Sequence, residues 1–277
     1  MRDGDRYQRA IEYVAAKADG GPADPAWRVN LQFHPDRLVD GEPILAALAR
    51  QRRYRSQFET GTSNGGLTAY PGGDRWRWES RLFGGAYDEA PASARPVYGA
   101  LNFRDRAVGG APRFGSAHFR LTRDCLARST FCYPDSFCEP VDFGVSWRMS
   151  LPGKALADDR DPLDDYIEAQ VHGQVLLAGD VEALVLDPCF RDTEIERLAK
   201  ALPCELEWHP GFRLGTSELR RHPEFRGARF VELGLALARH GLLDAGIVGD
   251  AARTGNYDEQ ELKRVWHYIA RFGEPVD

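Results

Sequence analysis

Residues 165–173 read Asp-Tyr-Ile-Glu-Ala-Gln-Val-His-Gly, and apolar and polar side chains alternate along them. Successive side chains of a β-strand point to opposite faces, so this alternation predicts a strand. Its apolar face consists of Ile167, Ala169 and Val171. Its polar face consists of Tyr166, Glu168, Gln170 and His172. Such a polar face either lines a cleft, where a carboxylate can bind hydroxyls or stabilise a cation, or simply faces water, as one side of many antiparallel sheets does.

The rest of the chain mixes short strands with separate helices. Alternating or apolar runs predict strands at 28–33, 53–58, 97–103, 114–121, 129–133, 181–186 and 205–208. Apolar stripes predict helices at 5–19, 42–52, 74–83, 193–202, 229–239 and 258–272, and a helical turn at 123–128. Residues 135–162 show no clear period and are predicted to form a long loop. This mixture predicts an α+β fold with an antiparallel or mixed sheet.

Composition limits the classes of function. The chain has 277 residues, enough to bury a full core, and 43% hydrophobic and 28% charged residues, as expected for a globular protein. Its net charge of −6 argues against broad binding to nucleic acid. No apolar run is long enough for a membrane span, and the charged first 19 residues lack a signal-peptide core. The five irregularly spaced cysteines suggest reduced thiols and a cytosolic setting.

Two turns carry groups that suit ligand binding. The loop Gly61-Thr-Ser-Asn-Gly-Gly66 offers hydroxyls, an amide and backbone N–H groups that can hold a phosphate, a ribose or a carboxamide. It lacks the Gly-Lys-Ser/Thr ending of a nucleotide-binding P-loop, and an ordinary surface loop is the alternative. His34-Pro-Asp-Arg37 follows a predicted strand, where functional side chains are common. Its alternative is a turn in which Asp36 caps the next segment.

Cysteine and histidine suggest two further chemistries. His118, Cys125, Cys132 and Cys138 have irregular spacings and no Cys-x-x-Cys pair, so no metal site is predicted. A Cys132–His172 pair would supply a thiol nucleophile. Cys132 lies in an apolar, strand-like run, however, where a buried structural thiol is the default.

A set of short motifs occurs in a distinctive order. They are Phe33-His-Pro-Asp-Arg37, Tyr54-Arg-Ser-Gln-Phe-Glu-Thr-Gly-Thr-Ser-Asn-Gly-Gly66, Leu82-Phe-Gly-Gly-Ala-Tyr-Asp88, Tyr98-Gly-Ala-Leu-Asn102, Phe114-Gly-Ser116, Thr130-Phe-Cys-Tyr133 and Tyr166-Ile-Glu-Ala-Gln-Val-His-Gly173. Together they resemble a bacterial family long known only as a domain of unknown function, whose best-known members are the CteC-like mono-ADP-ribosyltransferases. The resemblance covers about residues 5 to 210.

The resemblance implies an ADP-ribosyltransferase fold, PARP-like in outline, with an Asp–Glu catalytic pair. The Glu corresponds to Glu168, and the Asp to Asp36, with Asp135 as the alternative. Two departures from related transferases stand out. Tyr166 replaces the Glu or Gln that often precedes the catalytic Glu by two residues, which disfavours an arginine acceptor and fits a hydroxyl acceptor or no protein acceptor. The first strand also lacks a His-Gly-Ser/Thr triplet, which leaves open how the adenosine is held.

The implied substrate is NAD, used without a metal. Glu168 would stabilise the positive charge that develops on the ribose as the nicotinamide leaves, and Asp36 would take the proton of the acceptor. Arg37 would contact the diphosphate and Tyr98 would stack on the nicotinamide. The residues expected to contact NAD are His34, Arg37, Thr62, Ser63, Asn64, Gly65, Tyr98, Ser116 and Gln170.

The expected organisation is an N-terminal helix (1–22), a catalytic domain (23–212) and a helical C-terminal region (213–277) that either recognises the acceptor or closes the sheet. The resemblance implies transfer of ADP-ribose to a protein hydroxyl, a threonine of ubiquitin, which would block ubiquitination. This fits a bacterial effector acting in the producer's cytoplasm or delivered to a host cytosol. The alternatives are an NAD glycohydrolase, a Cys132/His172 thiol hydrolase and a catalytically silent protein-binding module.

Overall fold

The computed structural model describes residues 3–61 and 68–276, and its centre is one eight-stranded sheet. The strands are β1 (Val29–Phe33), β5 (Val97–Leu101), β6 (Ala117–Leu121), β7 (Ser129–Tyr133), β8 (Asp142–Val145), β9 (Ile167–Val171), β11 (Val181–Leu186) and β12 (Glu205–Trp208). Their order is β12-β11-β6-β1-β5-β9-β7-β8. Only β11 and β12 pair in parallel, and the other neighbours are antiparallel. The predicted α+β class with a mixed sheet is therefore confirmed.

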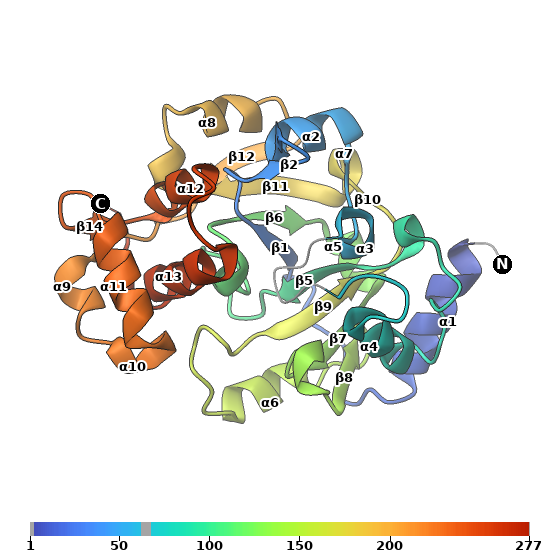
Figure 1. The fold of residues 1–277 in the computed structure, drawn as a ribbon. Coiled ribbons are helices and arrows are strands. Elements are labelled where there is room, and N and C mark those ends of the chain that lie inside the picture. The colour runs from blue at the N-terminus through green and yellow to red at the C-terminus, as the bar shows by residue number, and fades with distance from the viewer. Residues whose placement is uncertain (1–2, 62–67, 277) are drawn as a thin grey trace.

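Helices and short ribbons surround this sheet (Figure 1). The helices are α1 (Asp3–Ala15), α2 (Ile44–Gln51), α3 (Gln57–Thr60), α4 (Asp74–Leu82), α5 (Arg123–Ala127), α6 (Leu151–Ala157), α7 (Leu177–Asp180), α8 (Glu194–Ala199), α9 (Thr216–Leu219), α10 (Pro223–Arg226), α11 (Ala228–Leu237), α12 (Ala245–Arg253) and α13 (Glu259–Phe272). Single 3-10 turns are η1 (Ala92–Ala94), η2 (Pro112–Phe114), η3 (Ser136–Cys138) and η4 (Pro188–Phe190). The ribbons pair β2 (Leu38–Val39) with β3 (Glu42–Pro43), β4 (Arg53–Tyr54) with β10 (Val175–Leu176), and β13 (Leu214–Gly215) with β14 (Leu242–Leu243). None of the described helices is long and apolar enough to cross a membrane.

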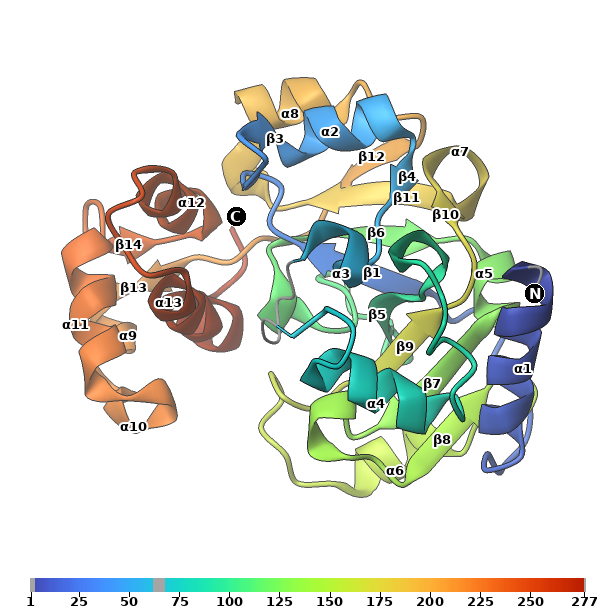
Figure 2. The same cartoon turned by 45° about the vertical axis from the view of Figure 1, so that its right-hand side comes forward.

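The two faces of the sheet differ in chemistry. One carries the main core, in which strand residues such as Leu31, Phe119 and Ala169 pack with side chains of α2, α6 and α8. On the opposite face, α1 and α4 cover the end near β8. The helix α13 lies near β1, since the indole of Trp266 donates a hydrogen bond to the carbonyl of Pro112 in η2 (2.9 Å). Figures 1 and 2 show β5 and β9 between α13 on one side and α4 on the other.

The C-terminal helices form a second core centred on Trp266, which is fully buried. Its ring contacts Phe212 edge to face (5.4 Å between centroids). It also contacts His34 at the end of β1 (5.1 Å). The turn η2 can approach β1 because residue 115 is glycine: a Cβ there would lie 2.1 Å from the backbone of Phe33. These contacts join the C-terminal helices to the polar face of the sheet.

Two predicted segments differ from the structure. Residues 135–162 are not a long loop, because they contain η3, β8 and α6. The strand predicted at 53–58 ends at Tyr54, where α3 soon follows. Ser56 starts that helix through a capping box with Glu59, a local signal that outweighs strand propensity.

Candidate active site

The candidate site is built around Glu168, the second residue of β9, which lies between β5 and β7. The predicted alternation is confirmed, because Ile167, Ala169 and Val171 belong to the main core. The alternative that the polar face sees water is wrong: Glu168 is 7% exposed and Gln170 1%. Side chains from α4 and η3 cover this part of the face.

The carboxylate of Glu168 accepts hydrogen bonds on both oxygens. Its Oε2 accepts from the hydroxyl (3.0 Å) and the backbone N–H (3.3 Å) of Ser136. Its Oε1 accepts from Nε2 of Gln170 (2.9 Å). The Ser136 hydroxyl in turn accepts from Nη1 of Arg75 (2.8 Å). Burial raises the pKa of Glu168, and the charge of Arg75 is the largest influence opposing the rise. The site thus holds a buried carboxylate that is well supplied with donors.

A chain of hydrogen bonds runs from Tyr87 to Glu168. Gln170 must turn its N–H₂ group toward the carboxylate, so its carbonyl oxygen accepts from the Thr130 hydroxyl (2.8 Å). Thr130 then accepts from Nε2–H of His172 (3.0 Å), whose Nδ1 accepts from the Tyr87 hydroxyl (2.7 Å). Burial lowers the pKa of His172 to about 3, so the ring is neutral, as this arrangement requires. Every donor in the chain points toward Glu168.

Helix α4 adds groups that the sequence analysis missed. Glu79 is fully buried and accepts from Nη1 of Arg95 (2.5 Å) and from the hydroxyl of Tyr98 (3.0 Å). Burial raises the pKa of Glu79 to about 7 against the charge of Arg95. Arg75 lies over the Tyr98 ring (4.4 Å), so one face of the ring expected to stack on nicotinamide is already covered. The four-residue spacing of Arg75 and Glu79 was the available signal, but such pairs usually lie on an exposed helix face.

Asp135, the alternative second carboxylate, lies beside Glu168. It precedes Ser136 and accepts a hydrogen bond from the hydroxyl of Tyr166. Its charge contributes to the raised pKa of Glu168. Its Oδ1 is buried, and no described residue donates to it. One oxygen of Asp135 is therefore a buried acceptor without a described donor beside Glu168.

Asp36 does not meet Glu168. Ala100 of β5 pairs with Asn30 on one side and with Glu168 on the other, so Asn30 is the residue of β1 level with Glu168. Asp36 lies six residues after Asn30, beyond the end of β1. Its side chain is 4% exposed and packs against α12, where a Cβ on Gly249 would lie 1.4 Å from Oδ2. Burial raises the pKa of Asp36 to about 6, against the charges of Arg37 and Arg253. The structure thus brings Asp135, and not Asp36, to Glu168.

The other predicted NAD contacts fall into separate groups. Gln170 lies at Glu168, whereas His34, Arg37 and Ser116 lie around the far end of β1. Burial, followed by the charges of Arg37 and Lys263, lowers the pKa of His34 to about 3. Ser116 is 1% exposed, and no described residue bonds to its hydroxyl. The remaining predicted contacts, Thr62, Ser63, Asn64 and Gly65, lie outside the described residues.

The alternative Cys132–His172 pair does not form, and Cys132 is a buried thiol, as expected by default. Both ring nitrogens of His172 are used by Tyr87 and Thr130. The Cys132 thiol lies instead beside Glu168 (3.8 Å), and burial and that charge raise its pKa well above the ordinary value. A nucleophilic thiolate is therefore disfavoured. Across residues 3–61 and 68–276, no group of three or more His, Cys, Asp or Glu side chains could hold a metal ion.

Fold and site together define an α+β protein with a buried acidic centre on an inner strand of its main sheet. The chain belongs to the family described as a protein of unknown function (DUF3626), which matches residues 28–159 and 150–272. The matched regions contain Arg75, Asp135 and Glu168 and extend to the last residue of α13. No curated protein matches the chain.

Proposed function

We propose that the protein transfers ADP-ribose from NAD to a hydroxyl group of another protein, and that this acceptor is a threonine of ubiquitin. The observation that carries the proposal is the buried Glu168 carboxylate, held by Ser136 and Gln170 with Asp135 beside it. NAD and ubiquitin come from the motif resemblance given above, and the geometry supplies suitable chemistry. The ADP-ribosyltransferase fold is part of the same proposal.

In the proposed reaction the bond between the ribose C1′ and the nicotinamide nitrogen breaks. Nicotinamide leaves with the electron pair, and positive charge develops on the ribose, as in glycoside cleavage. Glu168 stabilises that charge. Because its hydrogen bonds already fix the carboxylate, the carboxylate needs little reorientation during the reaction. The acceptor oxygen then attacks C1′, and its proton passes to Asp135, whose Oδ1 has no described donor.

The residue two positions before Glu168 supports a hydroxyl acceptor. Tyr166 occupies this position, and its hydroxyl donates to Asp135. A neutral hydroxyl needs a base near the reacting carbon, and Asp135 lies where it can serve as one. This hydrogen bond also restrains the side chain of Asp135.

Glu168→Gln tests the role of the carboxylate. We expect NAD turnover to fall by about 10²-fold or more, the usual effect of removing a charge-stabilising group. The thermal midpoint should fall by a few degrees, because the amide N–H₂ that replaces one oxygen would face a donor from Gln170 or Ser136. Glu182→Gln, on strand β11 at the other end of the sheet, is the matched control and should keep its activity. Turnover by Glu168→Gln near the wild-type rate would rule out this role.

Intact-mass spectrometry of ubiquitin with protein and NAD tests the acceptor. We expect one added ADP-ribose on a threonine, in a linkage that resists hydroxylamine because it is not an ester. NAD consumption with unmodified ubiquitin would instead indicate another acceptor or an NAD glycohydrolase. If NAD is not consumed, the protein-binding module becomes the better explanation.

A further inference from the structure

One face of helix α13 is basic and lies toward the Glu168 site. Lys263, Arg264, His267 and Arg271 recur at the spacing of one helix face. The opposite face, which includes Leu262, Val265 and Ile269, is fully buried in the second core. Arg271 pairs with Asp161 (2.8 Å) in the segment that leads to β9. The basic face therefore borders the loop before the Glu168 strand.

Further cations join this face from η2 and α10. Asp164 is shared by Arg113 (2.7 Å) and Arg226 (2.8 Å). Burial, followed by the charges of Arg113 and Arg264, lowers the pKa of Lys263 to about 8. Cations this close repel one another, and a bound anion would relieve the repulsion. We name Arg113, Lys263, Arg264 and His267 the α13 basic cluster.

Two buried donors in the α13 basic cluster lack an acceptor. Nε of Arg226 donates to Nδ1 of His267 (3.1 Å), so the hydrogen of this neutral ring is on Nε2. His267 is fully buried, and no described residue accepts from that Nε2–H. Nε of Arg113 is buried and likewise has no described acceptor. A buried donor without an acceptor is costly, so these N–H groups indicate a missing acceptor.

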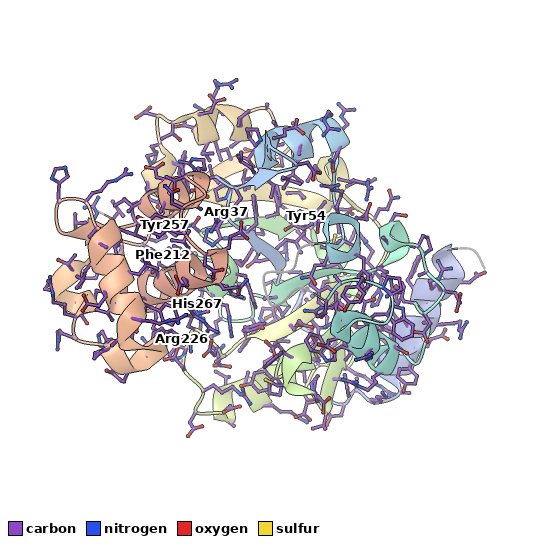
Figure 3. The ribbon with its side chains drawn as sticks, viewed as in Figure 1. Arg37, Tyr54, Phe212, Arg226, Tyr257 and His267 are labelled. Atoms are coloured by element: carbon purple, nitrogen blue, oxygen red, sulfur yellow. The ribbon has the colours of Figure 1, made fainter. Side chains whose placement is uncertain are left out.

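His267 lies among the cations. Its pKa is lowered to about 2 by burial and then by the charges of Arg113, Arg226, Lys263 and Arg264. Arg226 and His267, which come from α10 and α13, lie next to each other in Figure 3. The unpaired Nε2–H is thus a donor inside a strongly positive environment.

The α13 basic cluster is close to the Glu168 site. The guanidinium of Arg113 lies 5.9 Å from the ring centre of Tyr166, whose hydroxyl contacts Asp135. On its other side, Trp266, the residue before His267 on α13, contacts the ring of His34 (5.1 Å between centroids), and, after burial, the charge of Lys263 helps to lower the pKa of His34. The cluster therefore occupies the space between the end of β1 and the candidate catalytic residues.

We propose that the α13 basic cluster binds the diphosphate of a dinucleotide whose reactive end lies at Glu168. The proposal rests on the NAD chemistry above and assigns a substrate-binding role to the C-terminal helices. A diphosphate carries more than one negative charge and several acceptor oxygens. Arginine forks and a lysine ammonium suit such a group, and the N–H groups of His267 and Arg113 gain acceptors. The family match, which runs to residue 272, includes this helix.

Lys263→Met tests the proposal because it removes the charge and keeps the aliphatic stem. Arg264→Met, at an exposed position, provides a second variant if the first is unstable. Arg229→Met is the matched control, since that exposed arginine pairs with Glu261 and lies outside the cluster. Binding of inorganic pyrophosphate and of ADP is measured by calorimetry, and KM and kcat for NAD are measured separately.

We expect wild type and Arg229→Met to bind pyrophosphate, and the cluster variants to bind it about tenfold or more weakly. KM for NAD should rise by a similar factor, with kcat nearly unchanged. Unaltered pyrophosphate affinity and unaltered KM in both variants would refute the anion site. So would a change confined to KM for the acceptor protein, which would show that the cluster recognises acidic side chains there. If the protein binds pyrophosphate in a way that depends on Lys263 but does not consume NAD, the anion site is supported and the proposed function is refuted.

Discussion

Ser136 offers a sharp test of how Glu168 is held. Its hydroxyl donates to Glu168 and accepts from Arg75, so Ser136→Ala removes both contacts without leaving a large cavity. A hydrogen bond to a charged group contributes about 1.5–3 kcal/mol. If that contribution is made in the transition state, NAD turnover should fall by roughly 10- to 150-fold.

Ser129→Ala is the matched control for this experiment. Ser129 lies on β7, the strand next to β9, and is buried like Ser136. Its hydroxyl donates to the backbone carbonyl of Cys125 (2.7 Å). Both variants should lower the thermal midpoint by a few degrees, since each loses a buried hydrogen bond. Only Ser136→Ala should lose turnover. Equal turnover in the two variants, with equal stability, would show that Glu168 does not depend on Ser136.

The two candidate aspartates should behave differently. Asp135→Asn should reduce transfer to protein more than NAD hydrolysis, because water can reach the reactive ribose without a positioned base, whereas Asp36→Asn should leave both rates within about twofold. Asp36 should instead affect stability, because its folded-state pKa of about 6 lies above its ordinary value of 3.8. The protonated carboxyl therefore contributes fully to the free energy of unfolding below about pH 4, and this contribution is lost as the pH rises through 6. Urea unfolding between pH 4 and 7 should show this loss in wild type relative to Asp36→Asn, and parallel curves would contradict it. Gly249→Ala should destabilise far more than Gly246→Ala on the same helix, because the new Cβ would overlap Asp36 in the first case and only touch Asp244 in the second; equal midpoints would contradict the packing described here.

Strong local patterns predicted much of the fold. The alternation in residues 165–173 predicted both faces of β9, and the apolar stripe ending at Phe272 predicted α13. Residues 135–162 were missed because β8 is short and α6 begins Leu-Pro-Gly, which weakens any helical signal. Proline is nevertheless tolerated in the first turn of a helix.

The site was less predictable because it depends on contacts between distant segments. The choice between Asp36 and Asp135 could not be made from spacing, since both follow strands that end near polar turns. Strand order decides it: β7 pairs with β9 and delivers Asp135, whereas β1 is separated from β9 by β5. Arg75 reaches the site only because α4 packs over the polar face of β9.

The one-way chain from Tyr87 through His172, Thr130 and Gln170 has an electrostatic consequence. All its bond dipoles point their positive ends toward the Glu168 carboxylate, so their fields add there and polarise one another. Reversing a single link would leave two donors or two acceptors facing each other, so the chain holds one proton arrangement as a unit. A group as remote as the Tyr87 hydroxyl thus helps set the potential at the carboxylate without touching it.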